Sequence, residues 1–365
     1  MERFRKSLFA FILLTLSFSG LQAQKPAVDY STRLALIQKN IDQVFYMPQT
    51  GLYLETNDPA HNEKPNSYLW PLCALYQATN EREVLEPSKN YMAPVRKAIE
   101  QYHNTVPPVP GYQAYIRKAG VDTRFYDDNQ WIGITALDAY NRTQKKDYLT
   151  LGEDIYRFMM VGYDQAAGGG IYWKEDDKTT KNTCSNGPGI LVALELYRIT
   201  KQKAYLDKAV LLYDWTNKHL LAPEGVYYDA IKLPSLRIDS ARYTYNTGTM
   251  LQANALLYKL TKKQAYLTEA QRLAKTAKAY FYRNNKLPHD YWFNAVLLRG
   301  YLELYSIDKD KSRLQFFIDD AERIWQEERD AATNLLGRHT WKTLIDQAAM
   351  LEIYARLELL QNRKK

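Results

Sequence analysis

The 365-residue chain carries 49 Lys and Arg against 41 Asp and Glu, which gives a formal net charge of +8. This length allows one large domain or two smaller ones. The positive excess is mild and forms no basic stripe with interleaved aromatic residues, so nucleic acid is not an expected partner. The chain also has 30 Tyr and 7 Trp, more than a core of this size requires. Many of these rings should therefore line surfaces or clefts.

The first 23 residues have the features of a secretory signal peptide. Arg3, Arg5 and Lys6 precede a short apolar run over residues 8–18, and Ala23 supplies a small residue at the expected cleavage point. The apolar run is too short to span a bilayer, and no later segment reaches the required length. We expect an exported protein, periplasmic or secreted, with residues 24–365 forming a single domain and no membrane span.

A segment of the form apolar–Tyr–x–x–Thr recurs along the rest of the chain. Each copy is expected to end one apolar-periodic helix, to make a short polar turn and to precede a second helix. Six helix pairs favour a closed ring, because an open array would need polar capping repeats at its ends. We predict an all-α fold, an (α/α)6 barrel, in which the repeated Tyr and Thr serve packing and turn formation. The copies contain Tyr76, Tyr140, Tyr197 and Tyr258, and two weaker copies without the Thr contain Tyr305 and Tyr354.

Two adjacent carboxylates, Asp127 and Asp128, lie between aromatic residues just before an apolar-periodic segment. Glycoside hydrolysis usually needs two carboxyl groups across one bond, and aromatic faces offer a platform for sugar rings. Neighbouring side chains diverge by about 100° on a helix, so both can serve one substrate only where the chain turns, as at a helix start. The alternative is that one of them simply caps the following helix. The pairs at 176–177 and 319–320 show that such a doublet alone is not decisive.

Six loops rich in aromatic, Asn and Asp residues precede the first helices of the predicted pairs. Equivalent connections in a ring of hairpins lie on one rim, so these loops should converge on one cleft. After the glycines at 168–170, Tyr172 or Trp173 either stacks on a sugar or packs on the barrel. Asn186 either caps the helix that follows or donates to a sugar hydroxyl. The loops are residues 51–54, 126–131, 168–186, 227–229, 243–249 and 290–294.

Other chemistries fit the sequence poorly. The two cysteines, Cys73 and Cys184, are compatible with a disulfide or with two buried free thiols. The five histidines are scattered without compact metal-ligand spacing. The chain has no nucleophile elbow and no phosphate-binding loop. Neither a metal nor a cofactor is expected.

As an ordered set, these motifs resemble glycoside hydrolase family 76, the endo-acting α-1,6-mannanases. The resemblance covers residues 70–305 and implies an (α/α)6 barrel with a retaining mechanism. In that mechanism Asp127 would be the nucleophile and Asp128 the general acid/base. The matching elements are Asp-Asp-Asn at 127–129, Gly-Gly-Ile-x-Trp at 169–173, Cys-Ser-Asn-Gly-Pro at 184–188, Tyr-Asp at 228–229 and Tyr-x-Tyr-Asn-x-Gly-Thr at 243–249.

The resemblance implies a monomeric hydrolase that cleaves α-mannan backbones, such as those of fungal cell walls, as polysaccharide or oligosaccharide. Alternatives are a mannan transglycosidase of the same family, a non-catalytic glycan-binding protein, or another (α/α)6 enzyme such as a sugar epimerase. The epimerase alternative would require convergent histidines, which the rim loops lack. The candidate substrate-binding residues are Tyr126, Asn129, Gln130, Trp131, Tyr172, Trp173, Asn186, Asp229, Tyr245 and Asn246.

Overall fold

The computed structural model describes residues 28–362. The signal peptide expected over the first 23 residues lies outside the described residues. Across the described part of the chain, no helix has the length and apolar character needed to cross a bilayer.

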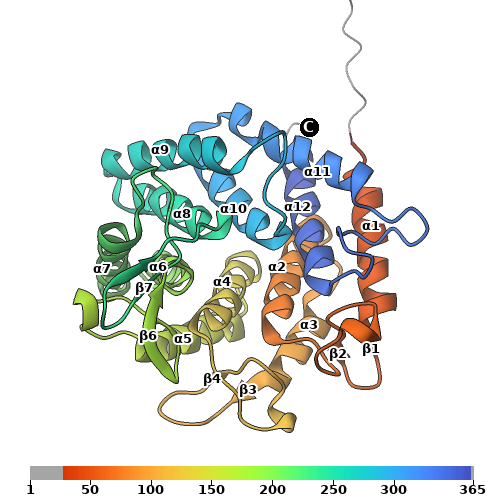
Figure 1. Cartoon of the computed structure of the whole chain (residues 1–365), viewed down its shortest axis with the longest axis horizontal. Coiled ribbons are helices and arrows are strands. Elements are labelled where there is room, and N and C mark those ends of the chain that lie inside the picture. Colours follow the sequence, from red (N-terminus) through yellow and green to blue (C-terminus); the bar gives the residue numbers. More distant parts are fainter. Residues whose placement is uncertain (1–27, 363–365) are drawn as a thin grey trace, which may run out of the picture.

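Six helices form a closed inner ring, which confirms the predicted (α/α)6 barrel. Each packs against the next, and the last returns to the first, because α12 packs against α2. Figure 1 shows this ring around the centre of the molecule. The inner helices are α2 (Leu69–Leu85), α4 (Tyr126–Thr143), α6 (Thr183–Thr200), α8 (Thr244–Thr261), α10 (Tyr291–Asp308) and α12 (Leu344–Asn362).

The remaining six helices lie outside the ring (Figure 1). Five of them follow an inner helix in the chain, as predicted. The sixth pair differs, because no helix follows α12 in the described residues. Its partner comes from the other end of the chain, where α1 packs against α12. The outer helices are α1 (Tyr30–Asn40), α3 (Met92–Ile99), α5 (Lys146–Val161), α7 (Lys203–Leu220), α9 (Gln264–Phe281) and α11 (Gln315–Glu327).

Burial patterns explain which helices occupy which ring. In α6, every residue over 183–196 is buried, as expected for a helix that is packed on all sides. In α9, the buried residues form one stripe at helical spacing, from Ala270 through Leu273, Ala274 and Ala277 to Phe281. The inner helix is thus buried on all sides and the outer helix on one side only.

The repeated Thr closes three inner helices in the same way. Its hydroxyl donates to the carbonyl four residues earlier over 2.7 Å and accepts the backbone N–H two residues later over 3.3 Å. The residue between adopts a left-handed conformation, and its N–H donates to the carbonyl of the repeated Tyr. The predicted turn role is confirmed at Thr143, Thr200 and Thr261.

Short strands cover the rim on which the inner helices begin, a feature that the sequence did not predict. An antiparallel sheet runs in the order β5-β6-β7-β8 and links the loops before α6 and α8. Its strands are β5 (Tyr172–Lys174), β6 (Asp177–Asn182), β7 (Ala230–Lys232) and β8 (Arg237–Asp239). Two small hairpins pair β1 (Tyr46–Met47) with β2 (Leu52–Tyr53) and β3 (His103–Asn104) with β4 (Gly111–Tyr112).

An amide clamp joins these rim segments to the barrel. The fourth residue of α4, Asn129, accepts from the Tyr112 N–H at 2.7 Å and donates to the Tyr112 and Phe125 carbonyls at 2.8 and 2.7 Å. Asn186, the fourth residue of α6, makes the equivalent three bonds to Ile171 and to the residue before the helix.

The same position in two other inner helices repeats the device. Gln347 of α12 clamps both backbone groups of Leu336, and the Thr247 hydroxyl of α8 accepts from the Tyr227 N–H. Because buried backbone groups must find partners, these side chains fix each rim segment to a helix start.

We predict that Thr200→Val lowers the free energy of unfolding by about 0.5–1.5 kcal/mol, since it removes the hydroxyl that closes α6. Denaturant unfolding measures this difference. Thr200→Ser, which keeps the hydroxyl, is the matched control and should retain most of the stability. Equal losses in both variants would show that the hydroxyl is not the stabilising group.

Candidate active site

A cavity of about 520 Å³ opens among the N-terminal ends of the inner helices, in the size range of ordinary ligand sites. We call it the central cavity. Five of the six predicted rim loops contribute residues to it, which confirms their convergence, whereas no residue of the loop at 51–54 lines it. Its lining residues are Trp70, Phe125, Asp127, Asp128, Trp131, Trp173, Asn182, Cys184, Asp229, Tyr243, Tyr245, Asp290, Trp292 and Phe293.

The two adjacent aspartates occupy the second and third positions of α4 and face this cavity. The residue at the N-cap is Phe125, and no side chain caps the helix. The capping alternative for Asp127 and Asp128 is therefore wrong. At the first turn, their negative charges face the free N–H groups of the helix, where a carboxylate is favoured.

Burial without a neighbouring cation changes the acidity of both groups. Burial raises the pKa of Asp127 from 3.8 to about 6, while contacts with the Cys184 thiol, nearby backbone N–H groups and the Trp173 indole oppose the rise. Burial, followed by the charge of Asp127, raises the pKa of Asp128 well above its usual value. Both carboxyl groups therefore keep a proton to higher pH than an exposed aspartate does.

Two further carboxylates line the central cavity. The Asp229 oxygens each accept an amide N–H at 3.3 Å, one from Asn182 and one from Asn246, and burial raises the pKa of Asp229. Asp290 occupies the N-cap position of α10, yet its carboxylate does not cap the helix. The lining, as far as the described residues form it, contains four Asp and no Lys, Arg or His. This chemistry suits an uncharged ligand.

Aromatic rings form most of the remaining wall. Tyr245 stacks on Phe293 with ring centroids 4.1 Å apart, and Phe125 packs against Trp173 at 5.0 Å. Trp70, Trp173 and Tyr243 each keep more than a third of their surface exposed. Exposed rings at a cavity mouth offer apolar faces to a ligand with C–H groups.

Contacts with Trp292 and Arg299 hold Trp131, a lining residue of the central cavity, in place. The Trp131 ring packs edge-on against Trp292 at 5.4 Å, and the Arg299 guanidinium lies 5.4 Å from the Trp131 ring centroid. Arg299 is itself held by two 2.6 Å hydrogen bonds to the buried Glu352. A cation–π contact of this kind restrains the indole.

Three buried polar atoms of the lining have no hydrogen-bond partner among the described residues. They are Asp127 Oδ1, Asn182 Oδ1 and Trp292 Nε1. Buried polar groups are almost always paired in native proteins, so each exception calls for an explanation. All three belong to residues that line the central cavity, although the atoms themselves are buried.

The structure divides the candidate substrate-binding residues into two groups. Trp131, Trp173, Asp229 and Tyr245 line the central cavity together with the aspartate pair. The others lie behind the lining, where their polar groups bind protein atoms or their rings pack on the core. They are Tyr126, Asn129, Gln130, Tyr172, Asn186 and Asn246.

Several lining residues were absent from the sequence-based set. Tyr243, Asp290, Trp292 and Phe293 lie in rim loops that the sequence did single out, so their loops were correct although the residues were not selected. Asn182 and Cys184 also lie in a singled-out loop, at 168–186. Trp70 and Phe125 lie at the starts of α2 and α4, outside the singled-out loops, and only the helix boundaries reveal their register.

Both cysteines are buried free thiols, so the disulfide alternative is wrong. The Cys73 thiol donates to the Asp128 carbonyl at 3.3 Å, and Cys184 lines the cavity beside Asp127. Over residues 28–362, no group of three or more His, Cys, Asp and Glu side chains is arranged to hold a metal ion.

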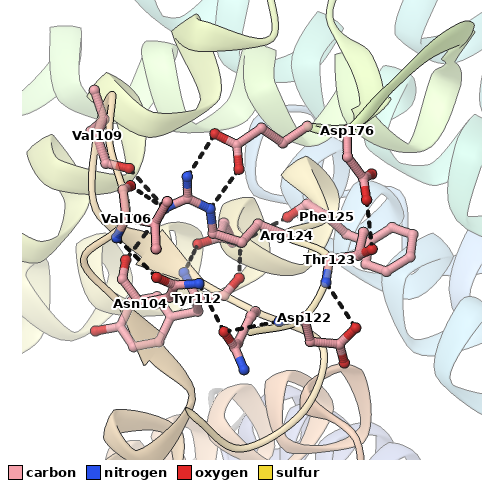
Figure 2. A network of polar contacts seen from close by, with 12 residues as sticks. Asn104, Val106, Val109, Tyr112, Asp122, Thr123, Arg124, Phe125 and Asp176 are labelled. Carbon is pink, nitrogen blue, oxygen red and sulfur yellow. Dashed lines mark hydrogen bonds and ion pairs between the residues drawn. The ribbon is translucent and has the colours of Figure 1, made fainter. Parts of the chain in front are cut away.

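A buried arginine joins two walls of the site. Arg124, next to Phe125, donates twice to the Glu175 carboxylate at 2.6 Å. Its remaining nitrogen donates to three backbone carbonyls of the loop after β3, at Asn104, Val106 and Val109. Figure 2 shows the guanidinium facing these groups. Because Glu175 follows β5, this network sets the position of Trp173 relative to the start of α4.

An (α/α)6 barrel with paired carboxylates in an aromatic-lined cavity that has no cationic side chain in its described lining defines a carbohydrate-type site. Comparison with known proteins agrees, because the model of glycosyl hydrolase family 76 matches residues 30–362. This chain belongs to that family.

Individual relatives are distant in sequence but close in fold. The chain is 25% identical to a family 76 α-mannanase from Bacteroides thetaiotaomicron, with a TM-score of 0.85 over 92% of this chain and 98% of the other. A second family 76 mannosidase structure from that organism is 26% identical, with a TM-score of 0.82 over 93% and 100% of the two chains. A mannan endo-1,6-alpha-mannosidase of Saccharomyces cerevisiae is 27% identical over 172 residues, 43% of this chain and only 38% of the yeast protein.

We predict that Arg124→Lys lowers the free energy of unfolding by about 1–3 kcal/mol, because an ammonium group cannot satisfy the carboxylate and three carbonyls together. Asp176→Asn is the matched control. It weakens only the neighbouring exposed bond from Thr123 and should cost less than about 0.5 kcal/mol. Denaturant unfolding of both variants separates the two effects, and equal losses would contradict the clamp.

Proposed function

We propose that this protein is an exported endo-acting glycoside hydrolase that cleaves α-1,6-mannosidic bonds in mannan backbones. The observation that carries the proposal is the buried pair Asp127 and Asp128, facing a cation-free aromatic cavity in a family 76 barrel. Residues 30–362, the span of the family model, would form a single catalytic domain.

The substrate class rests on the relatives and on the lining chemistry. The relatives compared above are described as an α-mannanase, a mannosidase and a mannan endo-1,6-alpha-mannosidase. A cavity with carboxylates, amide groups and aromatic faces, but no cation, matches a neutral polysaccharide better than an anionic one. Because this lining has no cationic side chain, the protein's net positive charge is not expected to hold an acidic polymer in the cavity.

A retaining mechanism would give the two aspartates distinct roles. Asp127 would attack the anomeric carbon and form a covalent mannosyl-enzyme intermediate. Asp128, whose pKa is raised well above its usual value by burial and by the charge of Asp127, would protonate the departing O6 and then remove a proton from the incoming water. This is a retaining mechanism, the class in which one carboxylate is the nucleophile.

The other carboxylates assist the same reaction. The transition state carries positive charge on the sugar ring, and fixed negative groups around the cavity would stabilise it without reorganisation. Asp229, oriented by Asn182 and Asn246, would also accept hydrogen bonds from sugar hydroxyls. Trp131, Trp173 and Tyr245 would contact the sugar faces.

The candidates behind the lining would act indirectly. Asn129 and Asn186 would position the rim segments through their clamps. Tyr126, Gln130, Tyr172 and Asn246 would support the walls or orient a lining residue, as Asn246 does for Asp229.

Incubation with linear α-1,6-mannan tests the function directly. Shorter products indicate hydrolysis, longer products indicate transglycosylation, and unchanged polymer would contradict both activities and leave a glycan-binding protein. The anomeric configuration of the first product, read by NMR, distinguishes retention from inversion.

We predict that Asp127→Asn and Asp128→Asn each lower kcat/KM on mannan by about a hundredfold to ten-thousandfold. Each should also raise the free energy of unfolding at neutral pH. A carboxyl whose folded pKa is raised costs stability as pH rises above its unfolded value of 3.8, and the amide removes that cost.

Product analysis and denaturant unfolding at neutral pH measure the two effects. Asp319→Asn, from an exposed member of another Asp-Asp pair, is the matched control and should change neither quantity appreciably. Wild-type turnover in either site variant would contradict the assigned roles.

The pH profile of kcat/KM provides a separate prediction. Activity should rise with pH through an acid limb near 6, because Asp127 must lose its proton before it can attack. Cys184→Ala should move this limb to higher pH, since the thiol contact lowers the pKa of Asp127. An acid limb near 3.8, the ordinary pKa of an aspartate, would contradict the raised pKa of Asp127.

A further inference from the structure

A second cavity of about 680 Å³ adjoins the central cavity. We call it the adjoining cavity. The two share Trp70 and Asp290 in their linings, so these residues stand at the junction between them. From the junction it extends to the segment between α11 and α12, where Arg338 and Trp341 line it, and to the first turn of α12, which contributes Asp346.

Ring stacking and hydrogen bonds fix one wall of the adjoining cavity in place. The Trp341 indole is stacked between two imidazoles, His61 at 3.9 Å and His339 at 4.5 Å between ring centroids. The same segment is tied to the loop after β2, because the Lys342 N–H donates to Asn57 Oδ1 at 2.6 Å and the Asn57 N–H donates to the Lys342 carbonyl at 3.0 Å. The wall is therefore fixed from both sides.

Asp290, Asp346 and Arg338 are polar residues in the lining of the adjoining cavity. Asp290 is at a helix N-cap, where an aspartate is among the best capping residues, yet it makes no capping bond. Asp346 is half-buried, and burial raises the pKa of its carboxyl to about 6, although a hydrogen bond with Thr343 opposes the rise. Arg338 adds a donor beside these acceptors.

This combination of acceptors, a donor and an aromatic wall is suited to hydroxyl groups. Its lining combines three carboxyl groups, those of Glu55, Asp290 and Asp346, with the single guanidinium of Arg338, and this excess of carboxylates disfavours an anion. Its volume lies within the ~300–1,000 Å³ of ordinary ligand sites. A polymer bound in the central cavity that continued past Trp70 and Asp290 would enter it.

We propose that the adjoining cavity binds further neutral sugar units of the same linear chain that occupies the central cavity, so that Asp346 and Arg338 set a preference for longer substrates. This inference rests on the proposed function and adds the part of the substrate that lies beyond the bond being cleaved.

The test compares a linear α-1,6-linked mannotrioside with the corresponding hexasaccharide. The readout is the ratio of kcat/KM for the hexasaccharide to that for the trisaccharide, which cancels any general change in activity. We expect the wild-type ratio to exceed one, and Asp346→Asn to lower it about tenfold, since a hydrogen bond to a charged group is lost.

Arg338→Gln, at an exposed position, should lower the same ratio and keeps the test valid if the Asp346 variant folds poorly. The matched control is Asp207→Asn on the exposed face of α7, which should leave the ratio unchanged. A wild-type ratio of one, or folded Asp346 and Arg338 variants with the wild-type ratio, would overturn this inference alone. A wild-type protein that cleaves neither substrate would overturn the proposed function and this inference with it.

Discussion

The central constraint on this molecule is the burial of two neighbouring carboxyl groups with no cation beside them. Removing such groups from water is costly, and here it shows as raised pKa values for Asp127 and Asp128. The chain offsets part of the cost by placing both on the first turn of α4, where free backbone N–H groups face them. Strain of this kind persists only when the surrounding structure holds it in place.

The surrounding structure supplies that support through the rim. Clamps from Asn129 and Asn186 attach rim segments to the starts of the inner helices. Arg124 ties β5 to the loop before α4, and Arg299 restrains Trp131 from beneath. Each wall of the central cavity is thus fixed to the barrel by a buried polar side chain. Pre-organised dipoles and charges of this sort can stabilise charge that develops during a reaction.

The sequence predicted the barrel because its evidence is periodic and repeated. It also identified the aspartate pair and the loops that surround it. It did not separate Asn129 and Asn186 from cavity-lining residues, because an Asn in an aromatic loop has the same sequence appearance whether it binds a ligand or a backbone. Nor did it identify Trp70 or Asp290 as lining residues. Whether they reach the cavity depends on where α2 and α10 begin, and the sequence does not fix these boundaries to the residue. The rim sheet was missed because its strands are short and polar, with β6 running over residues 177–182.

The pairing of α1 with α12 has a consequence for how the chain is assembled. The rings of Tyr30 and Tyr354 join α1 to α12, and Arg33 pairs with Glu322 of α11 at 2.6 Å. These contacts join segments that are far apart in the sequence. During synthesis α1 therefore emerges long before its binding surface exists. Entropy of loop closure increases only slowly with length, so such a long separation affects mainly the rate of folding. Docking of α1 must wait until α12 has formed.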